Sequence, residues 1–87
     1  MPVTSKDNQW VKEWRALCGD ARHRRESGRF AIEGARLCGD ALRSGLVCDT
    51  VLYTEEARQR YEAVVAPLLE QADRAVEITP ALAKQMG

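Results

Sequence analysis

Basic side chains dominate the chemistry that this sequence can offer. Three arginines and the only histidine form the stretch Arg22-His23-Arg24-Arg25, and Arg29 follows. Residues 1–45 carry nine Lys or Arg against six Asp or Glu, whereas residues 46–87 carry four against seven, so a net charge of zero hides two oppositely charged halves. Such a sign asymmetry indicates a surface that faces a polyanion. Because the stretch lies between two periodic segments, we expect a loop, and a solvated loop without a ligand remains the alternative.

No set of side chains has the composition of a catalytic or metal site. His23 is the only histidine, and its place among arginines favours a surface position over a role as base or metal ligand. The three cysteines (Cys18, Cys38 and Cys48) are odd in number and lack C-x-x-C spacing, which argues against a disulfide framework or a zinc site and favours the reducing cytoplasm. Nucleophile motifs and phosphate-binding glycine loops do not occur. We therefore expect a binding module that is not catalytic alone.

One further place could bind an anion. Glu33-Gly34-Ala35-Arg36 joins an expected strand to an expected helix. Free N–H groups at a helix N-terminus favour phosphate, and open α/β sheets bind ligands at that edge. The alternative is that Gly34 only permits a tight turn and Glu33 caps the helix.

Apolar spacing predicts the elements that must position these groups. Residues 8–18 form a helix whose apolar face includes both tryptophans, with Ser5 as N-cap and Gly19 at its end. The tryptophans are expected in the core. Three buried strands are predicted at 30–32, 50–53 and 75–78, alternating with helices. These helices cover 35–44 (ended by Gly45), 55–65 (capped by Thr54) and 80–84 (capped by Thr79, with Pro80 first), and Pro67 is expected to start a short turn through Gln71.

This order predicts a small α/β domain. Strands separated by helices imply right-handed crossovers and a parallel, helix-covered sheet. A chain of 87 residues forms one domain, 1–87, and buries only about 60–65% of its unfolded surface. No apolar run is long enough to cross a membrane, and residues 1–6 lack the apolar stretch that a secretory signal would have. The expected core includes Phe30, Ile32, Leu37, Val51 and Ile78, with Cys38 and Cys48 as small core residues.

A long ordered pattern extends from Thr4 to Gly45. It comprises Thr4-Ser5, Asn8, Val11-Lys12, Leu17, Arg22, Arg24, Gly28, Phe30, Glu33-Gly34, Arg36-Leu37, Ala41-Leu42 and Gly45. In order and spacing it resembles the N-terminal substrate-binding domain of the SpoU (TrmH-like) RNA 2′-O-ribose methyltransferases. The sequence departs from that pattern in Gln9, where proline is frequent, in Arg22, where lysine is common, and in Ala31-Ile32, where bulkier aliphatic residues are usual.

The resemblance implies a three-layer α/β/α sandwich with a small, mostly parallel sheet, similar to the kink-turn-binding ribosomal proteins. It also implies that the chain is a fragment. A knotted domain after residue 87 would bind S-adenosylmethionine, dimerise and carry the methyl-transfer residues, so no catalytic, cofactor or metal-binding residue is assigned here. The expected partner is RNA, with rRNA favoured over tRNA. The fragment would be monomeric and the intact enzyme a cytoplasmic homodimer.

The resemblance also implies RNA-facing positions. Asn8 and Lys12 match polar positions of the first helix, Arg22 and Arg24 match the basic pair, and Arg36 matches the arginine of E-G-x-R-L. We expect phosphate contacts from Lys12, Arg22, Arg24 and Arg25, with Arg29 and Arg36 as further candidates.

Two other functions stay open at this stage. One is a stand-alone RNA-binding protein of the kink-turn type, and the reading frame beyond Gly87 would distinguish it. The other is a docking domain that never touches RNA. A structure in which the basic side chains of Lys12, Arg22, Arg24 and Arg36 point in unrelated directions would favour it.

Overall fold

Two short parallel strands form the centre of the fold. The computed structural model describes residues 1–86. Strand β1 (Thr50–Tyr53) pairs with β2 (Arg74–Glu77), Thr50 opposite Arg74 and Tyr53 opposite Glu77, and Val3 bridges to Ile78 beside them. Six helices surround the strands: α1 (Gln9–Gly19), α2 (Ala21–Ser27), α3 (Ala35–Arg43), α4 (Glu55–Arg60), α5 (Glu62–Gln71) and α6 (Pro80–Met86).

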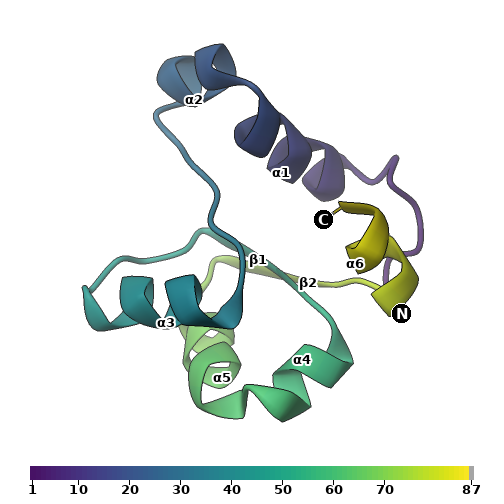
Figure 1. Cartoon of the computed structure of the whole chain (residues 1–87), viewed down its shortest axis with the longest axis vertical. Coiled ribbons are helices and arrows are strands. Elements are labelled where there is room, and N and C mark those ends of the chain that lie inside the picture. Colours follow the sequence, from purple (N-terminus) through teal and green to yellow (C-terminus); the bar gives the residue numbers. More distant parts are fainter. Residues whose placement is uncertain (87) are drawn as a thin grey trace.

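The strands run through the middle of the molecule, with α1 and α2 on one side and α3, α4 and α5 on the other (Figure 1). The crossover from β1 to the parallel β2 passes through α4 and α5, as a parallel pair requires. The structure therefore confirms the predicted small α/β class with a parallel sheet.

The predicted strand at 30–32 is wrong. This segment has no regular secondary structure, and Phe30 is 63% exposed. The apolar run is only three residues long, and it is bounded by Gly28 and Gly34, whose φ angles of 70° and 96° turn the chain at both ends. So short a segment can form few ladder hydrogen bonds, and none of the described residues pairs with it as a strand.

The loop expected at Arg22-His23-Arg24-Arg25 is also wrong, because residues 21–27 form helix α2. The Asp20 side chain accepts hydrogen bonds from the backbone N–H groups of Arg22 and His23 at 2.9 and 3.3 Å, which caps the helix at its N-terminus. Gly28 then ends the helix in the left-handed conformation. Arg24 and Arg25 occupy the last turn, where positive charge complements the helix dipole.

Helix caps elsewhere are partly as predicted. Asn8, not Ser5, caps α1, because Ser5 Oγ accepts from Asp7 N–H while Asn8 Oδ1 accepts from the first turn. The caps by Thr54 and Thr79 are confirmed, with distances of 3.1 Å to Ala57 N and 3.2 Å to Leu82 N. The end of α3 before Gly45, with φ of 81°, is confirmed as well.

The helical segment after β1 differs from the prediction. It breaks at Tyr61, which separates α4 from α5, and it continues to Gln71. Pro67 lies inside α5 instead of starting a new turn. Helix α5 packs against α3, and Pro67 removes one backbone donor from it.

A hydrophobic core cluster lies between α1, α6 and Ile78, the residue that follows β2. Val11, Ile78 and Leu82 are 0%, 5% and 1% exposed, and Val3, Val76 and Met86 pack against them. The prediction of Ile78 in the core is confirmed, and Ile32 and Val51 are half-buried. Phe30 and Leu37 were wrongly assigned to the core, since Leu37 is 54% exposed on α3 and Phe30 lies in the segment that does not join the sheet.

Candidate functional site

The corner between α1 and α2 is held by side chains of α2. Arg24 Nη1 donates to the carbonyl oxygens of Leu17 and Cys18 at 2.6 and 3.2 Å, at the C-terminal end of α1. His23 Nε2 lies 2.8 Å from Glu13 Oε1. Carbonyl groups at a helix end lack intrahelical partners, so the guanidinium satisfies groups that the helix leaves free. Arg24 and His23 therefore orient α2 against α1.

The opposite side of α2 presents two arginines to solvent. His23 and Arg24 face α1, and helical spacing places Arg22 and Arg25 on the far side. Arg22 Nε pairs with Glu26 at 2.9 Å, with side chains 79% and 64% exposed. Within residues 1–86, Arg25 is exposed and forms no ion pair. This side of α2 therefore offers exposed guanidinium groups to a polyanion.

The other predicted contacts do not join this surface. Asn8 Oδ1 accepts from the N–H groups of Trp10 and Val11 at 2.8 and 3.3 Å, so it stabilises α1. Lys12 is exposed on α1, on the side opposite the tryptophan face. Arg36 is exposed on α3, which lies apart from α1 and α2 in Figure 1.

The turn before α3 differs from one interpretation drawn from the sequence. Gly34 takes the N-cap position with φ of 96°, and no side chain caps the helix. The interpretation of Gly34 as a tight turn is confirmed, whereas Glu33 does not cap the helix.

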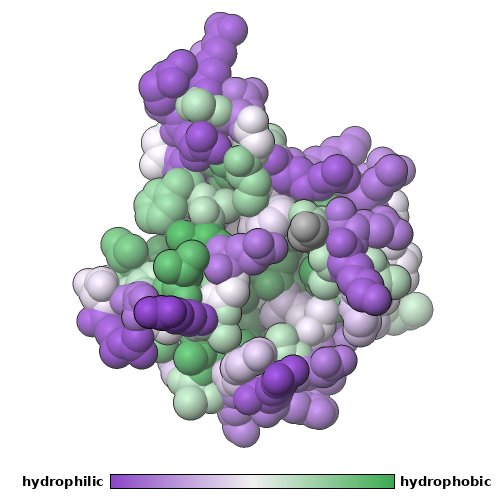
Figure 2. Space-filling model, in the orientation of Figure 1, coloured by the Kyte–Doolittle hydropathy of each residue, from purple (hydrophilic) through white to green (hydrophobic). Residues whose placement is uncertain are grey.

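Apolar surface gathers between α2 and α3 (Figure 2). Phe30, Leu46 and Val47 are 63%, 49% and 69% exposed, and all three line the mouth of a cavity of about 330 Å³. Exposed large apolar groups next to one another mark a binding surface more often than isolated ones do.

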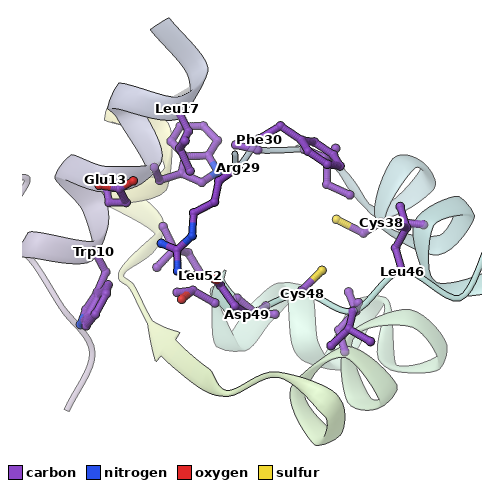
Figure 3. A pocket seen from close by; sticks show the side chains of 18 of the residues that line it. Trp10, Glu13, Leu17, Arg29, Phe30, Cys38, Leu46, Cys48, Asp49 and Leu52 are labelled. Carbon is purple, nitrogen blue, oxygen red and sulfur yellow. Dashed lines mark ion pairs between the residues drawn. The ribbon is translucent and has the colours of Figure 1, made fainter. Parts of the chain in front are cut away.

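Figure 3 shows how this cavity is built. Helix α1 forms one wall with Trp10, Glu13 and Leu17, and Cys38 and Leu46 lie on the opposite wall. Arg29 extends across the opening and pairs with Asp49 at 2.8 Å. Polar groups are thus few, and they lie among aromatic and aliphatic side chains, a composition typical of ligand pockets.

Sequence patterns did not identify Arg74 as a site residue. Its guanidinium carbon lies 3.7 Å from the centroid of the Trp10 ring, and its Nη1 donates to Thr50 Oγ1 at 3.1 Å. Arg74 belongs to the acidic half of the chain, and only the pairing of β2 with β1 brings it beside α1. Its one local signal was its place directly before the strand predicted at 75–78.

The cysteine thiols are poor nucleophiles. Burial raises the pKa of Cys38 and of Cys48 above the ordinary value, and the neighbouring Cys48 and Asp49 add to these two shifts respectively. Burial also raises the pKa of Cys18, Glu33 contributes in the same direction, and Arg24 opposes it. The thiolate is the reactive form, so a raised pKa leaves these residues protonated near neutral pH.

Elsewhere on the surface, the hydrogen bond from Arg58 lowers the pKa of Glu55, and the same contact raises the pKa of Arg58. Within residues 1–86, no three His, Cys, Asp or Glu side chains are placed to hold a metal ion together. None of the helices in that range has the length and apolar character needed to cross a bilayer.

Comparison with known proteins agrees with the sequence pattern. Residues 8–86 match the family model described as the MRM3-like substrate binding domain. Neither the curated proteins nor the solved structures contain a significant match. The match covers nearly the whole chain and confirms the resemblance to a substrate-binding domain of an RNA methyltransferase of the SpoU type. The chain belongs to the family of MRM3-like substrate binding domains.

Proposed function

We propose that this chain recognises the RNA substrate of an S-adenosylmethionine-dependent 2′-O-ribose methyltransferase. The family match over residues 8–86 carries the proposal. In this proposal, S-adenosylmethionine and the methyl-transfer residues belong to a separate knotted domain of the same cytoplasmic, homodimeric enzyme. The substrate is rRNA, with tRNA as the second possibility, and residues 1–87 contribute binding without catalysis.

The outer side of α2 supports this role. Arg22 and Arg25 are exposed on one side of a helix that Arg24 and His23 fix in place. Cations held on a rigid element contact phosphates without reading the base sequence. Their contribution to affinity falls as the salt concentration rises, because the release of counterions from the RNA then yields less free energy. Lys12 and Arg36 add positive charge at other positions, where they would contact RNA only if it wraps around the domain.

A charge-removal experiment tests the proposal. We expect Arg22→Ala/Arg25→Ala to weaken the binding of a structured RNA by about tenfold at low salt, because two phosphate contacts are lost. The slope of log affinity against log salt should fall by between about one and two. Fluorescence anisotropy of labelled RNA, measured at several salt concentrations, gives both quantities.

The matched control removes two exposed charges elsewhere, with Arg60→Ala/Lys84→Ala. These residues lie on α4 and α6, away from α2. The control should keep the wild-type affinity and salt slope within about twofold. Absence of RNA binding by the wild-type chain at low salt, together with unchanged methyl transfer when the α2 variant is introduced into the intact enzyme, would contradict the proposal.

A docking domain that does not touch RNA is the second candidate. The predicted basic residues do not form one surface, since Arg24 bonds to α1 and Arg36 lies on α3. The exposed apolar residues beside α3 also suit a protein partner. The salt titration separates this candidate, which requires no RNA affinity.

A stand-alone RNA-binding protein of the kink-turn type would also bind RNA in that titration. Methyl transfer by the intact protein separates this alternative from the methyltransferase.

A further inference from the structure

The cavity beside α1 has the dimensions and the lining of a small-ligand site. Its volume is about 330 Å³, within the range of about 300–1,000 Å³ that ligand pockets occupy. Trp10, Trp14 and Phe30 all line it, so three of the five aromatic side chains of the chain belong to the walls of one cavity. Flat aromatic rings stack on other flat rings, and stacking is the main way in which proteins hold unpaired bases.

One arginine, Arg29, lines this cavity, and a second, Arg74, contacts two residues that line it, Trp10 and Thr50. Arg29 crosses the opening toward Asp49 with its side chain 51% exposed (Figure 3). Arg74 lies over the Trp10 ring and is exposed. Each guanidinium has five N–H donors, and the contacts described use only some of them. Free donors next to an aromatic cavity suit a phosphate attached to an aromatic base.

The carboxylates in the cavity indicate which bases would fit. Glu13 and Asp49 both line it, and ionised carboxylates only accept hydrogen bonds. Cytosine, adenine and guanine carry an exocyclic amino group that can donate to them, whereas uracil has only its ring N3–H to donate.

We propose that this cavity binds one unpaired nucleotide of the RNA substrate, with the base between the aromatic side chains and the phosphate on Arg29 and Arg74. The inference rests on the proposed RNA-binding function and adds a site that reads single-stranded RNA. It explains why the exposed apolar residues at the mouth lie beside cations.

Tryptophan fluorescence offers a direct test, since Trp10 and Trp14 are the only tryptophans and both line the cavity. The probes are three RNAs with the same paired stem, ending in a loop of cytidines, in a loop of uridines, or in additional base pairs. The cytidine loop should quench the fluorescence and bind about tenfold more tightly than the uridine loop. The fully paired RNA should bind, as anisotropy detects, without quenching.

Two substitutions and a matched control complete the test. Phe30→Ala and Arg74→Gln should each weaken the binding of the cytidine-loop RNA by between about fivefold and a hundredfold. Neither should change the affinity for the fully paired RNA. Arg60 and Tyr61 form a similar pair outside this cavity, at 5.4 Å, so Arg60→Gln and Tyr61→Ala should change neither affinity. Asp49→Asn should reduce the preference for cytidine over uridine.

Distinct results would overturn the cavity site and the proposed function. Equal binding of loop and paired RNA, without quenching and without an effect of Phe30→Ala, rejects the cavity site and leaves the RNA-binding function intact. If free cytidine monophosphate quenches the fluorescence and binds with the same affinity as the cytidine-loop RNA, the cavity is a mononucleotide site and the proposal is wrong. Self-association that Phe30→Ala abolishes, measured by sedimentation, identifies a second copy as the occupant. No binding of any RNA at low salt rejects both proposals.

Discussion

Adjacent arginines of α2 have different physical roles. Arg24 donates to two carbonyl oxygens at the end of α1, whereas Arg25 is exposed and unpaired within residues 1–86. Their side chains point to different sides because successive helical residues are rotated by about 100°. A run of arginines in a sequence therefore does not imply a set of equivalent ligand contacts.

Single substitutions at these two positions should separate stability from binding. Arg24→Ala should lower the free energy of unfolding by about 1 kcal/mol, because carbonyl groups at the end of α1 lose a charged donor. Arg25→Ala should change it by less than about 0.5 kcal/mol. Urea denaturation followed by circular dichroism measures both. Equal stability of the two variants would show that Arg24 does not hold the α1–α2 corner.

Asn8 also has a structural role that the family pattern alone does not indicate. It matches a polar position of the family pattern, yet its side-chain oxygen caps α1. Its contribution to RNA binding stays a prediction, and its contribution to the helix is visible in the hydrogen bonds.

Helix α2 is an element whose boundaries were encoded by its caps. Asp20 accepts two backbone hydrogen bonds at the start, and Gly28 adopts φ of 70° at the end. The segment between them has no buried residue and no apolar periodicity, which is why hydrophobic patterning did not detect it. The Asp20 and Gly28 signals were present in the sequence and predict the helix once they are considered together.

Glycine substitutions should confirm the end of α2. Gly28→Ala should lower the free energy of unfolding by about 1 kcal/mol, because a β-carbon is strained in the left-handed conformation. Gly19→Ala is the matched control, since Gly19 is helical and an added methyl group would meet no atom within 4 Å. We expect the control to be neutral or stabilising by up to about 1 kcal/mol. Thermal unfolding of both variants measures the contrast, and destabilisation by both would contradict the assigned cap.

On the scale of the whole molecule, the core is smaller and differently placed than apolar composition suggests. One core cluster joins Val11 of α1, Leu82 of α6 and Ile78, which follows β2, and these residues are far apart in the sequence. The segment at 30–32 stays outside the sheet, and a cavity separates α1 from β1 and α3. The same absence of packing that leaves Phe30 exposed provides the space for the proposed nucleotide.

Two leucine substitutions test this arrangement. Leu82→Ala should lower the free energy of unfolding by about 2–5 kcal/mol, because it removes a side chain that is 1% exposed. Leu37→Ala should change it by less than about 0.5 kcal/mol, because Leu37 is 54% exposed. Differential scanning calorimetry measures both. A large loss from Leu37→Ala would place that residue in the core, as the helical pattern alone predicts.

The sequence by itself determined the α/β class, strands β1 and β2, the caps at Thr54 and Thr79, and the family. These features depend on local signals, such as β-branched runs, capping hydroxyl groups and an ordered spacing of motif residues. A few residues close in the chain are enough to specify each of them.

Only the tertiary structure decided which of the basic residues face solvent and which hold the fold together. It also placed Arg74 over Trp10, from the opposite end of the chain, and left Phe30 at the mouth of a cavity. Contacts between residues this far apart depend on how helices and strands pack, and local propensity does not encode that packing.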